Sequence, residues 1–180
     1  IEEEYWKNGG SPRMAVEYQD LLDMNVVSSE HLKNWMTENG ADPQRIHVCF
    51  TNIDTTRWRP DLEQRVTIRR ELKIEEDIPI ILYAGRICAQ KQPRVLAETM
   101  LRLIRKGLPF LTLVAGDGPD LEWLRSFIKK HRINERVRLL GTVSNERVRQ
   151  LMAATDIFFL PSLWEGISLS VFEAMACGLP

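Results

Sequence analysis

The sequence has 180 residues, with 24 Lys and Arg against 25 Asp and Glu and a formal net charge of -1. This length suits one ordinary domain with its own hydrophobic core and is too short for two full doubly wound domains. The near-zero charge gives no general attraction to nucleic acid or to an anionic membrane, so any basic site must be local.

Three cysteines, Cys49, Cys88 and Cys177, show no spacing typical of a zinc site. We expect free thiols in a reducing compartment and therefore a cytoplasmic protein. No apolar run approaches the ~20 residues of a membrane-spanning helix, and the acidic start at residues 1–4 is unlike a signal peptide. Because the chain lacks an initial Met and stops at a Gly-Leu-Pro sequence, which normally precedes a further strand, we expect a piece of a longer protein.

The first part of the chain predicts a small unit followed by a linker. Ser29 is a typical helix cap, and Gly40 would end the helix that it begins. Two strands and this helix are expected at residues 24–28, 46–50 and 31–39. The polar stretch 51–61 resembles a linker, and we expect a domain boundary near residue 55.

Strands and helices then alternate with short turns. The expected helices cover residues 65–72, 92–106, 119–131, 145–154 and 169–177. The expected strands cover residues 79–84, 110–115, 137–140 and 157–160. Strands that are apolar on both faces, alternating with amphipathic helices, indicate an α/β fold with a covered parallel sheet. We predict a Rossmann-like doubly wound domain over residues 56–180, incomplete at its C-terminus, with its site in the loops that directly follow the strands.

The loop after residues 79–84 carries two cations. Gly85, Arg86 and Lys91 lie close to the start of the next expected helix. Glycine lets the backbone approach a ligand, and a helix N-terminus favours anions, so this loop is a candidate grip for a diphosphate. Arg86 and Lys91 could equally be solvated residues at a helix entry, as most exposed Lys and Arg are.

Two glycine-containing loops follow the next strands. Residues 116–119, Gly-Asp-Gly-Pro, form a turn with Pro at a first helical position, which favours a simple connector over a direct ligand contact. Their glycines would still give a ligand access to the backbone. Gly141, Thr142 and Val143 end the following strand, where backbone groups could pair with a flat heterocycle.

The loop after residues 157–160 leads to two carboxylates. Glu165 lies in a Gly-containing loop, and Glu173 lies in the first turn of the next expected helix. Such carboxylates can accept hydrogen bonds from vicinal sugar hydroxyls. Ser170 and Glu173 also fit the S-x-x-E capping box, which would make Glu173 structural. Glu165 has no such capping partner and is the stronger candidate for a functional role.

The two carboxylates belong to a longer motif. Glu165 and Glu173, within S-L-W-E-G-I-S-L-S-V-F-E-A-M-A-C-G-L-P, resemble the Glu-seven-residues-Glu signature of group 1 retaining glycosyltransferases with the GT-B fold. Other segments fall in that family's order and spacing: residues 27–40, 52–55, 83–91, 116–119 and 140–141. Ser168 and Ser170 depart from the pattern, where Gly and Pro are frequent, as does Asn52, where the family often has Gly.

The resemblance implies the nucleotide-sugar-binding half of a two-domain enzyme, with residues 1–55 as the end of the N-terminal domain and the linker. The enzyme would transfer a sugar, with retention, from a nucleotide diphosphate sugar to an unknown acceptor. By resemblance, Arg86 and Lys91 would hold the diphosphate, Glu173 would hold the ribose, and Glu165 would be catalytic beside the donor sugar. The other implied donor contacts are Gly85, Gly116, Thr142, Val143, Gly166, Ile167, Ser168 and Leu169.

We expect no metal and no cofactor besides the donor, because the sequence has no Asp-x-Asp pair, the usual metal clamp of the other large glycosyltransferase fold. Membrane association would come only through the missing N-terminal domain, at the cytoplasmic face. A glycogen-synthase-like transferase, an epimerase of sugar nucleotides and a non-catalytic nucleotide-sugar-binding module stay as alternatives. A dehydrogenase is disfavoured because no Gly-x-Gly-x-x-Gly follows an expected strand.

Overall fold

The computed structural model describes residues 10–180, so the acidic start of the chain lies outside the described residues. The chain divides into two compact units, Ile1–Asn52 and Ile53–Pro180. The sequence pattern places the boundary near residue 55. Within residues 10–180, no helix combines the length and the apolar character needed to cross a membrane.

The first unit pairs two short parallel strands, β1 (Asn25–Val27) and β2 (Ile46–Val48). Helix α3 (Glu30–Glu38) connects them, and the Ser29 hydroxyl accepts a hydrogen bond from the amide of Leu32 at 3.2 Å, as expected of a cap. The other elements in the described part of this unit are helix α2 (Ser11–Glu17) and two 3-10 turns, η1 (Gln19–Leu21) and η2 (Pro43–Arg45). The sequence pattern does not predict α2, because seven residues are too few to establish a helical hydrophobic period.

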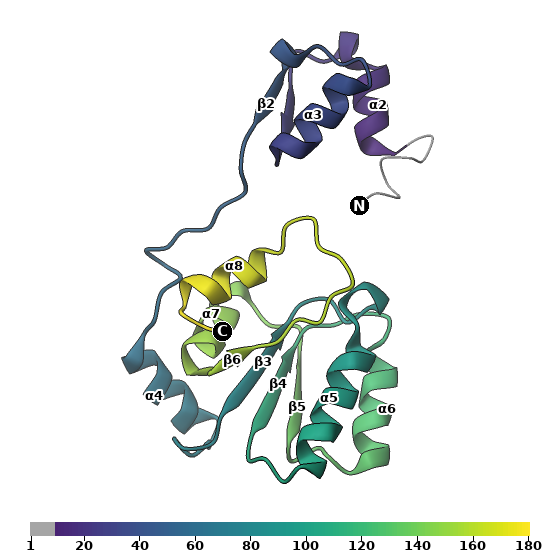
Figure 1. Ribbon diagram of the computed structural model, residues 1–180. Helices are drawn as coiled ribbons and strands as arrows, with labels where there is room; N and C mark the ends of the chain where they lie inside the picture. Colours follow the sequence, from purple (N-terminus) through teal and green to yellow (C-terminus); the bar gives the residue numbers. More distant parts are fainter. Residues whose placement is uncertain (1–9) are drawn as a thin grey trace. The chain divides into compact units, whose positions relative to one another are not determined.

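The second unit has the predicted doubly wound architecture (Figure 1). Its parallel sheet has the strand order β5-β4-β3-β6, with the strands at Ile80–Ala84 (β3), Leu111–Ala115 (β4), Val137–Gly141 (β5) and Ile157–Phe158 (β6). The helices are α4 (Leu62–Glu71), α5 (Pro93–Arg105), α6 (Leu121–His131), α7 (Asn145–Ala154) and α8 (Leu169–Ala176), and η3 (Ala89–Lys91) precedes α5. Strand β6 is shorter than the expected 157–160, because only Ile157 and Phe158 pair with β3 before the chain reaches Pro161, which has no N–H.

The sheet separates two hydrophobic cores. Ile80, Leu82 and Ala84 of β3 face the core that buried residues of α4, α7 and α8 share, whereas Ile81 and Tyr83 face the core of α5 and α6. Successive strands step from β3 to β4 to β5, and the chain then returns to the other side of β3 to form β6. Such a reversal opens a crevice at the carboxyl ends of the two strands that flank it, which are β3 and β6 here.

The expected linker contributes to the second unit. Trp58 is 6% exposed and is buried in the core beneath α4, α7 and α8, and Ile53 packs against the same core. Asp61 caps α4 by accepting a hydrogen bond from the amide of Gln64 at 2.9 Å. The polar stretch is therefore ordered against the sheet domain from Ile53 onward.

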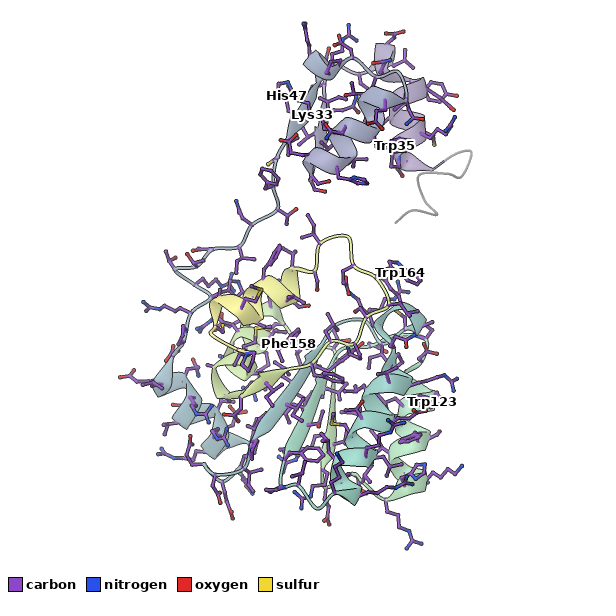
Figure 2. All side chains as sticks on the ribbon, in the orientation of Figure 1. Lys33, Trp35, His47, Trp123, Phe158 and Trp164 are labelled. Atoms are coloured by element: carbon purple, nitrogen blue, oxygen red, sulfur yellow. The ribbon has the colours of Figure 1, made fainter. Side chains whose placement is uncertain are left out.

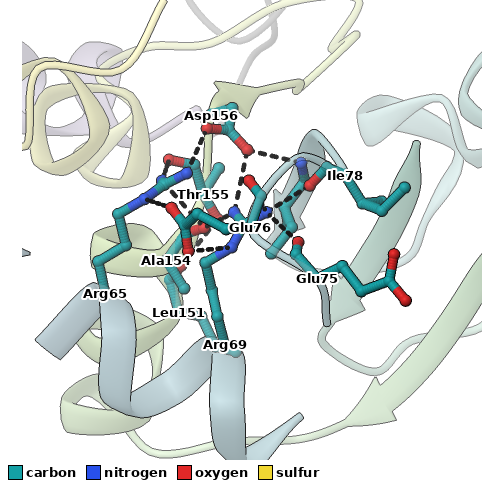
Figure 3. Close-up of polar contacts among 10 residues, drawn as sticks. Arg65, Arg69, Glu75, Glu76, Ile78, Leu151, Ala154, Thr155 and Asp156 are labelled. Carbon is teal, nitrogen blue, oxygen red and sulfur yellow. Dashed lines mark hydrogen bonds and ion pairs between the residues drawn. The ribbon is translucent and has the colours of Figure 1, made fainter. Parts of the chain in front are cut away.

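A buried arginine fastens the amino-terminal side of the sheet (Figure 3). Arg69 of α4 is 1% exposed, and its guanidinium donates to the carbonyl of Ala154 at 2.9 Å and to the Asp156 carboxylate at 3.2 Å. Asp156 also accepts from the amide of Ile80 at 2.7 Å and from Arg65 at 2.9 Å. These bonds join α4, the end of α7 and the starts of β3 and β6, at the opposite end from the loops that carry the candidate site.

Candidate functional site

A cavity of about 470 Å³ lies at the carboxyl ends of β3, β4 and β5. Its walls come from the loops after these strands and from the first turns of α7 and α8. The lining residues are Ala84, Gly85, Arg86, Ala115, Gly116, Asp117, Thr142, Val143, Asn145, Val148, Leu169, Ser170 and Glu173. The tertiary structure thus brings seven of the predicted site residues to one cavity: Gly85, Arg86, Gly116, Thr142, Val143, Leu169 and Glu173.

The other predicted residues lie outside the lining of this cavity: Lys91, Glu165, Gly166, Ile167 and Ser168. Lys91 and Glu165 contact each other, since the ammonium group donates to the carboxylate in an ion pair. Both side chains are largely buried, with 17% and 25% of their surface exposed. The β3 and β6 loops therefore meet beside the cavity, at the crevice that the strand order creates.

The Lys91 contact opposes the effect of burial on the pKa of Glu165. Burial by itself raises the pKa of this carboxyl, but hydrogen bonds from Lys91 and Ser162 and the positive charge of Lys91 outweigh it, so the pKa is lowered. Glu165 is therefore a carboxylate at neutral pH. The sequence showed no structural partner for it, and the structure supplies one, because Lys91 lies on a loop distant in sequence.

Glu173 has a different environment. Burial raises the pKa of its carboxyl, and the charge of Arg57 offsets this only in part. Within the described part of the chain, we find no hydrogen bond that its carboxylate accepts. A half-buried acceptor beside a cavity, without a protein donor, is available to hydroxyl groups of a ligand.

The capping-box interpretation of Glu173 is wrong. Helix α8 begins at Leu169, one residue earlier than Ser170, and its cap position is Ser168. No side chain caps this terminus, and the Ser168 and Ser170 hydroxyls instead lie 3.1 Å from each other. The amide of Val171 already donates to the Ser168 carbonyl at 3.1 Å, so the amides of Leu169 and Ser170 are the ones that keep their hydrogen-bonding capacity for a ligand.

The loop that carries Arg86 is held from two sides. The buried Tyr83 hydroxyl donates to the carbonyl of Arg86 at 2.9 Å, and the amide of Ile87 donates to the carbonyl of Asp117 at 2.8 Å. A Cβ atom at Gly118 would lie only 2.2 Å from the carbonyl oxygen of Ile87. The Gly-Asp-Gly-Pro segment is thus more than a connector, because its glycines let the second loop pack against the first.

Sequence reasoning missed several contributors to the site. Asn145 and Val148 of α7 line the cavity, and Tyr83 and Gln90 hold its loops. The position of Asn145 at the start of a helix after a predicted strand was an available signal for the first two. No local pattern distinguishes Tyr83 or Gln90, since their partners come from tertiary contacts.

Known proteins are similar to this chain in sequence and in fold. The model of the family "Glycosyl transferases group 1" matches residues 64–180. Alpha-D-kanosaminyltransferase of Streptomyces kanamyceticus is 30% identical over 131 residues, which cover 73% of this chain and 32% of that protein. D-inositol 3-phosphate glycosyltransferase of Rhodococcus erythropolis is 33% identical over 150 residues, covering 78% of this chain and 33% of that protein.

Among solved structures, HepE of Anabaena in complex with UDP and glucose superposes with a TM-score of 0.76 and 19% sequence identity. The match covers 97% of this chain and 48% of that one. The chain therefore spans about a third of the length of the two curated relatives and about half of HepE. The fold is that of one half of a GT-B glycosyltransferase, and the chain belongs to the group 1 glycosyl transferases.

Proposed function

We propose that this chain binds the nucleotide diphosphate sugar donor for a retaining sugar transfer. One observation carries the proposal: Arg86 and Glu173, a cation and an acceptor suited to the two polar parts of a nucleoside diphosphate, line the same cavity of about 470 Å³. The UDP and glucose named for HepE support a ligand of this class.

The proposed contacts divide the donor among the loops. Arg86 is exposed at the cavity and, within residues 10–180, has no carboxylate partner, so its charge is available to a diphosphate. The uncapped start of α8 offers further amides to the phosphates. Glu173 would accept from the ribose hydroxyls, and Thr142 and Val143 would border the base.

The donor sugar would lie toward the ion pair of Lys91 and Glu165. In the proposed reaction the departing diphosphate gains negative charge, which Arg86 and Lys91 would stabilise, while the sugar carbon gains positive charge, which Glu165 would stabilise. Backbone groups of Gly166, Ile167 and Ser168 would complete the sugar side. This set of contacts requires no metal ion.

The whole reaction needs an acceptor site, which we place in a second domain. The curated relatives are about three times as long as the part that this chain matches, and we propose that the unit Ile1–Asn52 ends that domain.

We propose a cytoplasmic location on the basis of the thiols of Cys49, Cys88 and Cys177, which are all free. A non-catalytic nucleotide-sugar-binding module or a GT-B epimerase would keep the same cavity, and a transferase assay distinguishes them.

Calorimetric binding of UDP-, GDP- and ADP-sugars, with and without EDTA, tests the proposal. We expect micromolar binding to one of the three that EDTA leaves unchanged and that Arg86→Ala weakens about 10- to 100-fold, because a charge-assisted hydrogen bond contributes about 1.5–3 kcal/mol. Arg105→Ala, at the far end of α5, is the matched control and should bind normally. Equal affinity of wild type and Arg86→Ala would refute the proposed role of Arg86.

A further inference from the structure

We propose that Gln90 is a positioning residue that holds the Glu165 loop against the cation loop. The inference rests on the proposed function, because it concerns where Glu165 lies relative to the donor. Two hydrogen bonds carry it: the amide of Leu163 donates to the Gln90 carbonyl at 2.8 Å, and the Gln90 side-chain amide donates to the Trp164 carbonyl at 3.0 Å. We call these two bonds the Gln90 clasp.

The clasp continues directly into the ion pair. Gln90 binds Trp164, and the next residue on each loop, Lys91 and Glu165, forms the charged contact. Three consecutive contacts therefore join two short segments that lie 74 residues apart in the sequence. A lysine side chain is long and flexible, so the ion pair alone would leave Glu165 free to shift, whereas the clasp fixes the backbone on which it stands.

Burial adds little at Leu163 and Trp164, the two residues of the loop that the clasp holds, although most other residues of 161–168 are half-buried. Leu163 is 60% exposed and Trp164 is 52% exposed, and residues 161–168 form no helix or strand. Figure 2 shows Trp164 on this loop, between β6 and α8. Where apolar contacts are few, backbone hydrogen bonds decide local stability, so losing one of them loosens the loop.

The other side of the clasp is well anchored. Gln90 lies in η3, which is closed by a hydrogen bond from the amide of Lys91 to the carbonyl of Cys88 at 2.9 Å. The next residue but one, Gln92, has a left-handed backbone with φ of 53° and leads into Pro93 of α5. Gln90 is therefore a fixed point from which an exposed loop is positioned.

Two variants separate the hydrogen bond from the side-chain volume. Gln90→Ala removes the side chain, and Gln90→Glu keeps its shape but replaces the amide donor with an acceptor facing the Trp164 carbonyl. Gln92→Asn is the control, because the one hydrogen bond of the Gln92 side chain within residues 10–180 goes to the nearby carbonyl of Ala89 at 3.4 Å, and Asn tolerates a left-handed backbone.

We would measure hydrogen exchange of residues 161–168 and the affinities for UDP and UDP-glucose. Both Gln90 variants should exchange about 3- to 10-fold faster in this loop, as expected for the loss of one hydrogen bond. Affinity for UDP should stay within about twofold, while the additional affinity that the glucose confers should fall. In turnover by the full-length protein, kcat should fall about tenfold, and KM for the donor should rise by no more than the loss of UDP-glucose affinity.

The outcomes are distinguishable. Unchanged loop exchange in both Gln90 variants, or the same change in Gln92→Asn, overturns the positioning role. If the Gln90 variants exchange faster in this loop but the wild-type protein binds no nucleotide sugar, the Gln90 clasp is supported and the proposed function is overturned. If the loop exchanges faster and the affinity for UDP falls as much as the affinity for UDP-glucose, Gln90 supports the whole cavity. That result also overturns its proposed role in positioning Glu165.

Discussion

Replacing Glu173 tests the site and its energetics together. The pKa of its carboxyl is raised by burial, so the folded state favours the protonated form. A raised pKa in the folded state contributes stability that is present below the unfolded pKa and is lost as the pH rises through the folded pKa. At neutral pH the charged carboxylate is therefore a local cost to stability.

Glu173→Gln removes that cost and keeps the size of the side chain. We expect its melting temperature at pH 7 to equal or exceed that of wild type, with the gap closing near pH ~4, the ordinary range of a Glu pKa. About 1 kcal/mol corresponds to ~2–4 °C for a domain of this size, which differential scanning calorimetry resolves. Because Glu173 does not cap α8, Glu173→Ala should also leave the helix intact, and Glu98→Gln on the exposed face of α5 is the control.

The same variants should weaken nucleotide binding. Two ribose hydroxyls that donate to a carboxylate contribute about 1.5 kcal/mol each at the low end, or ~3 kcal/mol together. Glu173→Ala should thus lose about 100-fold in affinity for a nucleoside diphosphate, and Glu173→Gln, which keeps one acceptor oxygen, about tenfold. If Glu173→Gln melts at a lower temperature than wild type at pH 7 and binds UDP as tightly, both the expected sign of the stability change and the proposed role of Glu173 in ribose binding are wrong.

Two predictions concern the scaffold. Arg69→Met should destabilise the protein by about 3–5 kcal/mol in urea unfolding, because it removes a buried partner of Asp156. The control is Arg70→Met, an exposed neighbour, which should cost less than about 0.5 kcal/mol. A similarly small effect of Arg69→Met would contradict the proposed role of Arg69 in holding this end of the sheet together. Gly118→Ala should lower both stability and nucleotide affinity, since its Cβ would lie 2.2 Å from the Ile87 carbonyl, and overpacking of this kind costs about 1–3 kcal/mol. Gly107→Ala, whose Cβ meets nothing within 4 Å, measures the backbone effect alone, and an equal loss there would show that the loop contact is unimportant.

The layers of the sheet domain could be predicted from the amino-acid pattern alone. Apolar residues on both faces of 79–84 and 110–115, between amphipathic helices, required a parallel sheet covered on both sides, and β3 and β4 lie there with their helices on the two faces. The pattern also indicated which loops matter, because every loop after a strand of such a sheet opens at the same edge. Arg86 and Glu173 accordingly line one cavity, although their loops are distant in the sequence.

The choice of partners, by contrast, depends on tertiary contacts. Lys91 contacts Glu165 because β6 pairs with β3 instead of extending the sheet beyond β5. The hydrophobic period of a segment does not reveal beside which strand that segment will pair. The start of α8 at Leu169 agrees with the expected helix 169–177, but the S-x-x-E pattern alone could not show that Ser170 does not cap it. Trp58 and Arg69 resemble linker and surface-helix residues in their local sequence, and both are buried because residues distant in the chain cover them. Hydrophobic periodicity shows which face of a segment is apolar, whereas hydrogen-bond and ion-pair partners depend on which distant segments the tertiary fold brings together.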